Sequence, residues 1–234
     1  MSDAQAEPDT RTRLLDAAEE LFAERGWSGA SMRELTSRAG ANLAAVGYHF
    51  GGKEELFHEV VLRRIKAVNE IRLTRLDELE AEVGQPTVDQ LVSAFVDPVL
   101  ECSEGPRGEH FLRLVARTHG DPDGPWRAAV ARAPFAEVLG RFARALGAAA
   151  PHLSAEDVGW RLHLMVGALV HTLMHREAAC AHGDMPFAPA LSNSEALRAQ
   201  LVAFLSGGLA APPAAPPDGD EHRAAPCDSP QRTQ

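Results

Sequence analysis

The sequence has few cysteines and no long hydrophobic run. Its three cysteines, Cys102, Cys180 and Cys227, are widely spaced and odd in number, and none belongs to a C-x-x-C pair. This pattern argues against a disulfide framework and against a zinc knuckle. No stretch of 18 apolar residues occurs, and residues 1–13 lack the apolar region of a secretory signal. The sequence therefore predicts a cytoplasmic protein with no membrane segment.

An excess of positive charge is lacking as well. The formal net charge is -10 at pH 7 and the pI is about 5.5, which argues against nucleic-acid binding over the whole surface. Residues 10–66 nevertheless carry nine Lys and Arg against eight Asp and Glu, a net charge of +1. Contact between this segment and DNA would depend on where the cations are placed.

Strand-like alternation is also absent, and apolar residues repeat with a helical period instead. We expect Pro134 to kink or split one of the resulting helices. From Gly207 the chain is rich in proline and alanine without an apolar period, which is typical of a disordered tail. The pattern predicts helices over 10–26, 31–39, 43–49, 53–82, 87–103, 108–119, 123–148, 154–182 and 193–206.

Residues 31–53 contain two short predicted helices separated by a glycine. Ser31 and Glu34 have the spacing of a capping box, which marks the start of the first helix. Gly40 can take the left-handed conformation that ends this helix. Asn42 can either cap the second helix or contact a base edge or a phosphate. Two helices joined in this way form a helix-turn-helix, which presents its second helix to the major groove of DNA.

The second helix has a core side and an outer side. Val46 and Phe50 are spaced to face the core at i and i+4. The outer side is left with two small residues, which allow contact with thymine methyl groups, and two residues that can donate to phosphates. These outward residues are Ala44, Ala45, Tyr48 and His49.

Lys53 and Arg33 are candidate phosphate contacts. A cation at a helix N-terminus lies at the unfavourable end of the helix dipole, so Lys53 at the start of the helix 53–82 needs another explanation. A phosphate oxygen bound together with the backbone N–H groups of Gly51 and Gly52 would supply it. A lysine solvated beside two glutamates is the alternative. Arg33 lies in the first turn of its helix, where the same argument applies.

Residues 12–61 resemble the N-terminal domain of the TetR family of transcriptional regulators. The resemblance rests on Leu15-x-x-Ala18-x-x-Leu21-Phe22, Gly26-Trp27, Arg33, Ala39-Gly40, Tyr48-His49-Phe50 and Lys53-x-x-Leu56. It implies an all-α homodimer that binds a double-stranded DNA operator. The contacts it implies are Ser31, Met32, Arg33, Asn42, Leu43, Ala44, Ala45, Tyr48, His49 and Lys53.

Two departures refine this resemblance. Leu43, Ala45 and Gly47 stand where the family often has Lys, Thr and Tyr, so phosphate contacts from those side chains are lost. The runs NLAAVGYHFGGK and RLHLMVGALVHTLM are instead similar to the branch of fatty-acid-responsive PsrA-type regulators.

Periodicity and resemblance together predict an all-α fold in three parts. Residues 10–55 form a three-helix helix-turn-helix domain. A long helix joins it to a helical ligand-binding and dimerisation bundle over residues 56–206. Residues 207–234 form a disordered tail.

The C-terminal half has more large apolar side chains than one helical layer needs. An ordinary core is the simplest interpretation. The alternative is an apolar pocket whose filling changes the spacing of two DNA-reading heads. An acyl chain suits such a pocket, so the candidate ligands are a fatty acid or an acyl-CoA. The candidate pocket residues are Phe95, Phe111, Arg113, Trp126, Phe142, Met165 and Leu169.

The last two predicted helices are expected to pair with those of a second copy in a four-helix seam. Such a dimer places two recognition helices about one DNA turn apart, which predicts a pseudo-palindromic operator. The candidate interface residues are Trp160, His163, Gly167, His171, Met174 and Leu201.

The leading hypothesis is a homodimeric repressor that a small apolar ligand releases from DNA. A metal-dependent helical enzyme is one alternative, because His171 and His175 have the spacing of a helical metal pair. No third ligand has a matching spacing, and nucleophile-elbow and phosphate-loop motifs are absent. We therefore expect no enzyme, no metal and no cofactor. A protein-binding helical adaptor is the second alternative.

Overall fold

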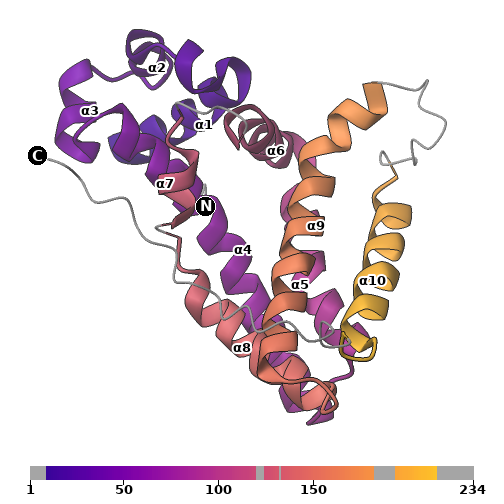
Figure 1. The fold of residues 1–234 in the computed structure, drawn as a ribbon. Coiled ribbons are helices and arrows are strands. Elements are labelled where there is room, and N and C mark those ends of the chain that lie inside the picture. The colour runs from indigo at the N-terminus through magenta and orange to yellow at the C-terminus, as the bar shows by residue number, and fades with distance from the viewer. Residues whose placement is uncertain (1–8, 120–123, 132, 182–192, 215–234) are drawn as a thin grey trace, which may run out of the picture.

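The computed structural model of the protein describes residues 9–119, 124–131, 133–181 and 193–214. Within these ranges every regular element is a helix, so the predicted all-α class is confirmed (Figure 1). The helices are α1 (Thr10–Gly29), α2 (Met32–Arg38), α3 (Leu43–Phe50), α4 (Lys53–Val83), α5 (Val88–Cys102), α6 (Gly105–His119), α7 (Trp126–Ala131), α8 (Phe135–Ala149), α9 (Ala155–Ala181) and α10 (Ser194–Ala210).

The first three helices and the start of α4 enclose an N-terminal core. At its centre Phe57 meets Phe22 and Trp27 edge-on, with ring centroids 5.2 and 5.5 Å away. Edge-to-face contacts of this kind are favourable beyond the area they bury. Leu14, Leu21 and the other apolar residues of α1 pack around the rings. The helical period of α1 in the sequence therefore marks its buried side.

Helix α1 changes direction at Gly26, the residue at which the sequence predicts the helix to end. Gly26 has φ 69°, a left-handed conformation that side chains disfavour. One further turn then continues to Gly29. This corner places Trp27 against Phe22, which closes one side of the N-terminal core.

The predicted capping box at the start of α2 is wrong. Ser31 is the N-cap residue, but its side chain makes no capping hydrogen bond. Glu34 instead accepts from Arg38 Nη2 at 2.7 Å, one turn later in the same helix. An i, i+4 ion pair holds the carboxylate away from the N-terminus.

Helix α4 belongs to two cores. Leu56, Phe57, Val60 and Val61 lie in the N-terminal core, while Leu76 lies in a second core. With 31 residues and no proline or glycine inside, the helix is about 46 Å long. The N-terminal core thus extends past residue 55 into the long helix.

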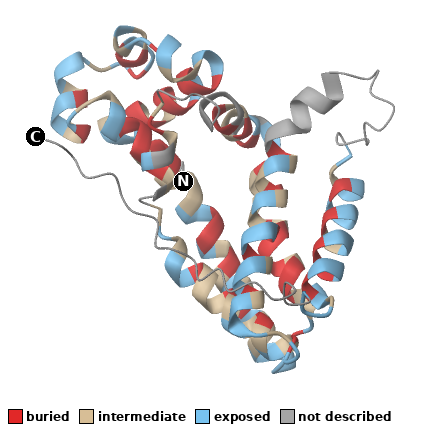
Figure 2. Ribbon diagram, viewed as in Figure 1, coloured by how far each residue is buried: buried red, intermediate tan, exposed pale blue. Residues whose placement is uncertain are grey.

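The second core lies between α4, α5, α8, α9 and α10. Phe95 of α5 and Phe142 of α8 meet edge-on at its centre, with centroids 5.1 Å apart. Buried residues occupy the inner sides of α9 and α10, and exposed residues occupy the outer sides of α2 and α3 (Figure 2).

Helices α6 and α7 connect this second region to the N-terminal core. Helix α6 packs along α1 (Figure 1). Leu114 of α6 and Ala129 of α7 are fully buried in the N-terminal core, far in sequence from its other members. The head formed by α1–α3 therefore rests on α6 and α7 as well as on α4.

A buried carboxylate reinforces the contact between α1 and α4. Glu19 accepts from Arg63 Nη2 at 2.6 Å and from Arg64 Nε at 2.7 Å. Arg63 also donates to Asp16 at 2.7 Å. Because a buried charge is costly unless it is paired and hydrogen-bonded, these arginines stabilise Glu19 only in this docking of the two helices.

One predicted break is confirmed and one boundary differs. Pro134 splits the predicted helix 123–148 into α7 and α8, as expected, because proline cannot donate within a helix. Helix α10 continues through Gly207 and Gly208 to Ala210, since Leu209 is buried in the second core. Residues 207–210 are therefore helical, contrary to the predicted tail. The rest of that tail, from residue 215, lies outside the described residues.

We expect Phe57→Ala to lower the free energy of unfolding by about 3–5 kcal/mol, because it removes a fully buried ring. Tyr48→Ala is the matched control, since Tyr48 is 87% exposed. It should change stability by no more than about 0.5 kcal/mol. Urea unfolding of both variants at one protein concentration measures the difference. Equal losses in the two variants would contradict the proposed centre of the core.

Candidate nucleic-acid interface and internal cavity

The turn between α2 and α3 forms as the sequence predicts. Gly40 has φ 59°, which ends α2. Asn42 caps α3, because its Oδ1 accepts from the backbone N–H of Ala45 at 2.9 Å. Val46 and Phe50 are both buried. These contacts fix the orientation of α3 on the N-terminal core.

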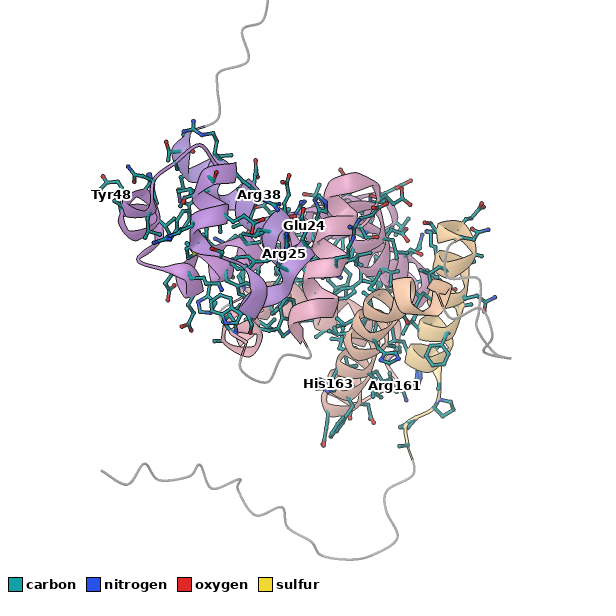
Figure 3. The ribbon with its side chains drawn as sticks, turned by 90° about the horizontal axis from the view of Figure 1, so that it is seen from above. Glu24, Arg25, Arg38, Tyr48, Arg161 and His163 are labelled. Carbon is teal, nitrogen blue, oxygen red and sulfur yellow. The ribbon has the colours of Figure 1, made fainter. Side chains whose placement is uncertain are left out.

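The outer side of α3 is exposed. Tyr48 is 87% exposed and projects from the end of the head (Figure 3). Leu43 and Ala44 are also exposed, whereas Ala45 and His49 are half-buried. The ring of His49 meets that of Tyr48 edge-on, with centroids 5.0 Å apart. Of the four residues predicted to face outward, two are therefore fully exposed and two are partly covered.

A shallow depression beside α3 includes one cation that the sequence reasoning missed. Arg13 of α1 lines it together with Thr10 and residues of α3. Its Nε donates to the carbonyl of Ala39 at 3.1 Å, and its Nη2 donates to Thr10 Oγ1 at 3.2 Å. Only the packing of α1 against the α2–α3 turn brings Arg13 here, so no local signal reveals it.

Lys53 has an intramolecular partner that the sequence did not suggest. Its Nζ donates to the carbonyl of Trp27 at 2.6 Å and lies 4.5 Å from the centroid of the indole ring. Burial lowers the pKa of this amine from its ordinary value. Lys53 therefore ties the start of α4 to the Gly26 corner. An ammonium has three donors, so phosphate contact by the others stays a prediction.

The first turn of α2 presents two of its three predicted contacts to solvent. Ser31 and Arg33 are exposed, and Met32 packs partly against the N-terminal core. Arg33 forms no ion pair with any residue that the structure describes. Its charge is available for an external anion.

Arg38, by contrast, is neutralised within the head. Its Nη2 donates to Glu24 at 2.8 Å and to Glu34 at 2.7 Å. These hydrogen bonds raise the pKa of Arg38 above its ordinary value. Figure 3 shows Glu24, Arg25 and Arg38 together on the head, away from Tyr48. Arg38 is therefore an exposed cation whose charge is already paired within the head.

A cavity of about 370 Å³ lies inside the C-terminal half. Four of the seven predicted pocket residues line it, namely Phe95, Phe111, Trp126 and Leu169. Most of the other lining side chains are aliphatic or aromatic. A volume of this size falls within the usual range of small-molecule sites.

The other three predicted pocket residues do not line the cavity. Phe142 and Met165 are buried in the second core behind it. Arg113 pairs with Glu109 at 2.9 Å, one turn earlier on α6. Apolar periodicity marks a buried residue, but it does not show whether a cavity or another side chain lies beside it.

The polar lining comes from α4, which the sequence reasoning treated only as a connector. Arg64, Asn69 and Arg72 all line the cavity. Arg72 Nε donates to the carbonyl of Phe95 at 2.8 Å, and its Nη1 donates to Asn69 Oδ1 at 3.3 Å. The guanidinium carbon lies 3.7 Å from the centroid of the Phe95 ring. Burial lowers the pKa of Arg72 to about 10, so the group stays protonated at neutral pH.

One side of α9 and α10 exposes large apolar residues. Trp160 and Leu164 of α9 are 62% and 64% exposed, and Phe204 of α10 is 72% exposed. The predicted interface residues His163, Gly167 and His171 are exposed on α9 as well. His163 lies far from Tyr48, on the opposite side of the molecule (Figure 3).

Two predicted interface residues do not belong to this surface as described. Leu201 is buried within the second core, where it packs inside the protomer rather than facing outward. The side chain of Met174 lies outside the described residues.

The described side chains contain no group of three His, Cys, Asp or Glu that could hold a metal ion. The side chain of His175, one half of the predicted metal pair, lies outside them. None of the described helices is long and apolar enough to cross a membrane.

Two family models match the chain. Residues 14–60 match "Bacterial regulatory proteins, tetR family", and residues 93–208 match "Tetracyclin repressor-like, C-terminal domain". The HTH-type transcriptional regulator SrpR of Pseudomonas putida is 41% identical over 121 residues, which are 52% of each protein. The chain spans about half the length, or less, of the first curated relatives it matches.

Solved structures share the fold. FadR of Bacillus halodurans, a fatty acid degradation regulator, superposes with a TM-score of 0.61 at 15% identity, over 84% of this chain and 98% of that one. FadR of Bacillus subtilis, solved in complex with stearoyl-CoA, gives a TM-score of 0.60 at 15% identity, over the same shares of the two chains. At this identity the likeness concerns the fold alone.

Proposed function

The chain belongs to the TetR family of helix-turn-helix transcriptional regulators, and on this premise we propose that it is a homodimeric repressor that a small apolar ligand releases from a pseudo-palindromic operator. The observation that carries the proposal is one helix, α4, that starts beside the recognition helix and lines the cavity. The ligand is a fatty acid or an acyl-CoA.

The exposed side of α3 reads the operator in this proposal. Leu43 and Ala44 meet base edges and thymine methyl groups, because small or apolar side chains allow close approach in the major groove. Tyr48, His49 and Arg33 donate to phosphates and set the register of the helix on the duplex. Arg13 adds a cation from α1 beside the same surface. The full predicted contact set, from Ser31 to Lys53, belongs to this proposal.

We expect Arg33→Ala to weaken DNA binding and to reduce its salt dependence. Each phosphate contact contributes about 0.9 to the slope of log K against log salt, so a dimer that loses two contacts should lose about 1.8. Arg144→Ala is the control, since Arg144 is exposed on α8 and belongs to no proposed contact. Gel shifts with the DNA upstream of the protein's own gene, at several salt concentrations, give the slopes. Equal slopes for wild type and Arg33→Ala would contradict the assigned contact.

The exposed side of α9 and α10 forms the dimer seam in this proposal. Trp160, Leu164 and Phe204 are large apolar residues exposed on adjacent helices. Clustered apolar exposure of this kind marks an interaction surface. Gly167, about one turn after Leu164 on α9, is also exposed and permits close approach of a second helix. Two-fold pairing along this surface gives one composite bundle of four helices.

We expect Trp160→Glu to convert the dimer to a monomer at micromolar concentration, because it places a charge in the centre of an apolar seam. Val83→Glu is the control, since Val83 is also exposed and apolar but lies at the far end of α4. Light scattering after size exclusion measures the mass, and circular dichroism checks that both variants stay folded. A Trp160→Glu protein that keeps the mass of a dimer would refute this seam.

In this proposal a ligand in the cavity acts on the head through residues that contact both the cavity and the N-terminal core. Phe111 and Trp126 line the cavity and also pack against the N-terminal core. Arg64 lines the cavity and donates to the buried Glu19 of α1. A ligand that fits the cavity better at one position of these groups shifts the head toward that position. In the dimer this changes the distance between the two recognition helices.

We expect fatty acids or acyl-CoAs of at least one chain length to release the wild-type protein from DNA. Leu139→Trp should bind DNA normally but need at least about tenfold more ligand, because Leu139 lines the cavity and the indole would fill it. Arg144→Trp places the same bulk on the exposed side of α8 and should respond like wild type. Gel shifts with a ligand series measure the response. Failure of every chain length to release the wild-type protein would exclude the lipid assignment.

A further inference from the structure

Arg72 is a buried cation at the wall of a cavity whose lining is mostly apolar. Its side chain is only 7% exposed, and it lines the cavity beside Phe95, Val68 and Val99. Removing a charge from water is costly unless an opposite charge or several hydrogen bonds compensate for it. A chain that needed only an apolar cavity would place an aliphatic residue here.

The described residues supply no counter-charge for Arg72. None of their carboxylates lies within 4.0 Å of it. The nearby thiol of Cys102 has a pKa that burial raises above its ordinary value, so it is neutral at neutral pH. The guanidinium is held only by a carbonyl, an amide oxygen and the face of a ring.

These contacts orient the guanidinium without using all of its donors. Nε is occupied by the carbonyl of Phe95 and one N–H of Nη1 by Asn69. Nη2 has no hydrogen-bond partner among the residues that the structure describes. The ring of Phe95 covers one face, 3.7 Å away. A planar group with a covered face and free donors at its edge is suited to bind a carboxylate.

The neighbouring arginines of α4 are already paired. Arg64 also lines the cavity, but the buried Glu19 neutralises it. Arg75, one turn after Arg72, donates to Glu101 at 2.5 Å on the surface. Of these three arginines, only Arg72 offers the cavity a positive charge that no described carboxylate balances.

We propose that the cavity binds a free carboxylic acid with an apolar chain, and that the Arg72 guanidinium, oriented by Asn69 and Phe95, pairs with its carboxylate. This inference rests on the proposed function and narrows its ligand to the free acid. An acyl-CoA has a neutral thioester at the position where the free acid has a carboxylate. The apolar lining accepts the chain, while Arg72 selects the ionised head.

The cavity volume sets an approximate chain length. A water molecule occupies about 30 Å³ of liquid volume, and a methylene group is of similar size. The volume of about 370 Å³ therefore suits a chain on the order of ten carbons. Dodecanoic acid is a suitable probe, and octanoic and hexadecanoic acids bracket it.

Calorimetric titration of the delipidated full chain without DNA tests the proposal directly. The probes are dodecanoic acid, 1-dodecanol, methyl dodecanoate and dodecanoyl-CoA, which share a chain and differ in the head. We expect the acid to bind roughly 10- to 100-fold more tightly than the alcohol and the methyl ester, the usual size of a charge-assisted hydrogen bond. Dodecanoyl-CoA should also bind more weakly than the acid, because its thioester carries no carboxylate. Equal affinity for acid, alcohol and methyl ester would overturn the proposal.

Variants assign the preference to one side chain. Arg72→Met should bind the acid and the alcohol equally, while Arg72→Lys should keep part of the preference for the acid. Arg75→Met is the matched control, because it removes an arginine from the same helix outside the cavity. It should behave like wild type. Thermal unfolding of the four proteins checks that they are folded, and the head-group series on wild type needs no variant at all.

The outcomes separate this proposal from the proposed function. Preferential acid binding that depends on Arg72, with no effect on a gel shift, would support the carboxylate site and refute ligand release. Release of DNA by the alcohol and the methyl ester as readily as by the acid would support ligand release and refute the carboxylate site. Failure of all four probes, and of the shorter and longer acids, to bind would overturn the carboxylate site.

Discussion

The continuity of α4 is the constraint on which the rest of the structure depends. One end of this helix packs beneath the recognition helix, and the other end lies in the second core. With no proline or glycine inside it, the helix has no built-in point of bending. This one helix therefore lines the cavity and also contributes to the core on which α3 rests. A change in the packing of the C-terminal part of α4 therefore changes the position of the N-terminal part, on which the head rests.

Helices α6 and α7 connect the second core to the N-terminal core in addition to α4. Leu114 of α6 and Ala129 of α7 are buried in the N-terminal core. The head is thus held at two places, and the cavity lies between the two supports. The buried Glu19, paired with Arg63 and Arg64, keeps α1 in register with α4. Tightly packed cores and helix interfaces change between discrete arrangements rather than deforming gradually.

The sequence predicted what short-range geometry determines. Gly40, Asn42, Val46 and Phe50 act on backbone and core within one or two turns, and each has its predicted conformation or burial. The failures arise where another partner competes for a side chain or where several helices must pack together. Glu34 pairs with Arg38, one turn later in α2, instead of capping the helix. Which of the large apolar residues of the C-terminal half line the cavity depends on how the six helices α4–α9 pack, and so does the position of Arg72. No pattern within one helix contains that information.

Helix α3 has one side that is buried in the core and one side that is exposed. Val46 and Phe50 hold it in the core, whereas Leu43, Ala44 and Tyr48 are exposed and hold nothing in place. Substitutions at such exposed positions usually change stability by no more than about 0.5 kcal/mol. The proposed operator contacts at these positions can therefore change one side chain at a time while the core that carries α3 stays intact.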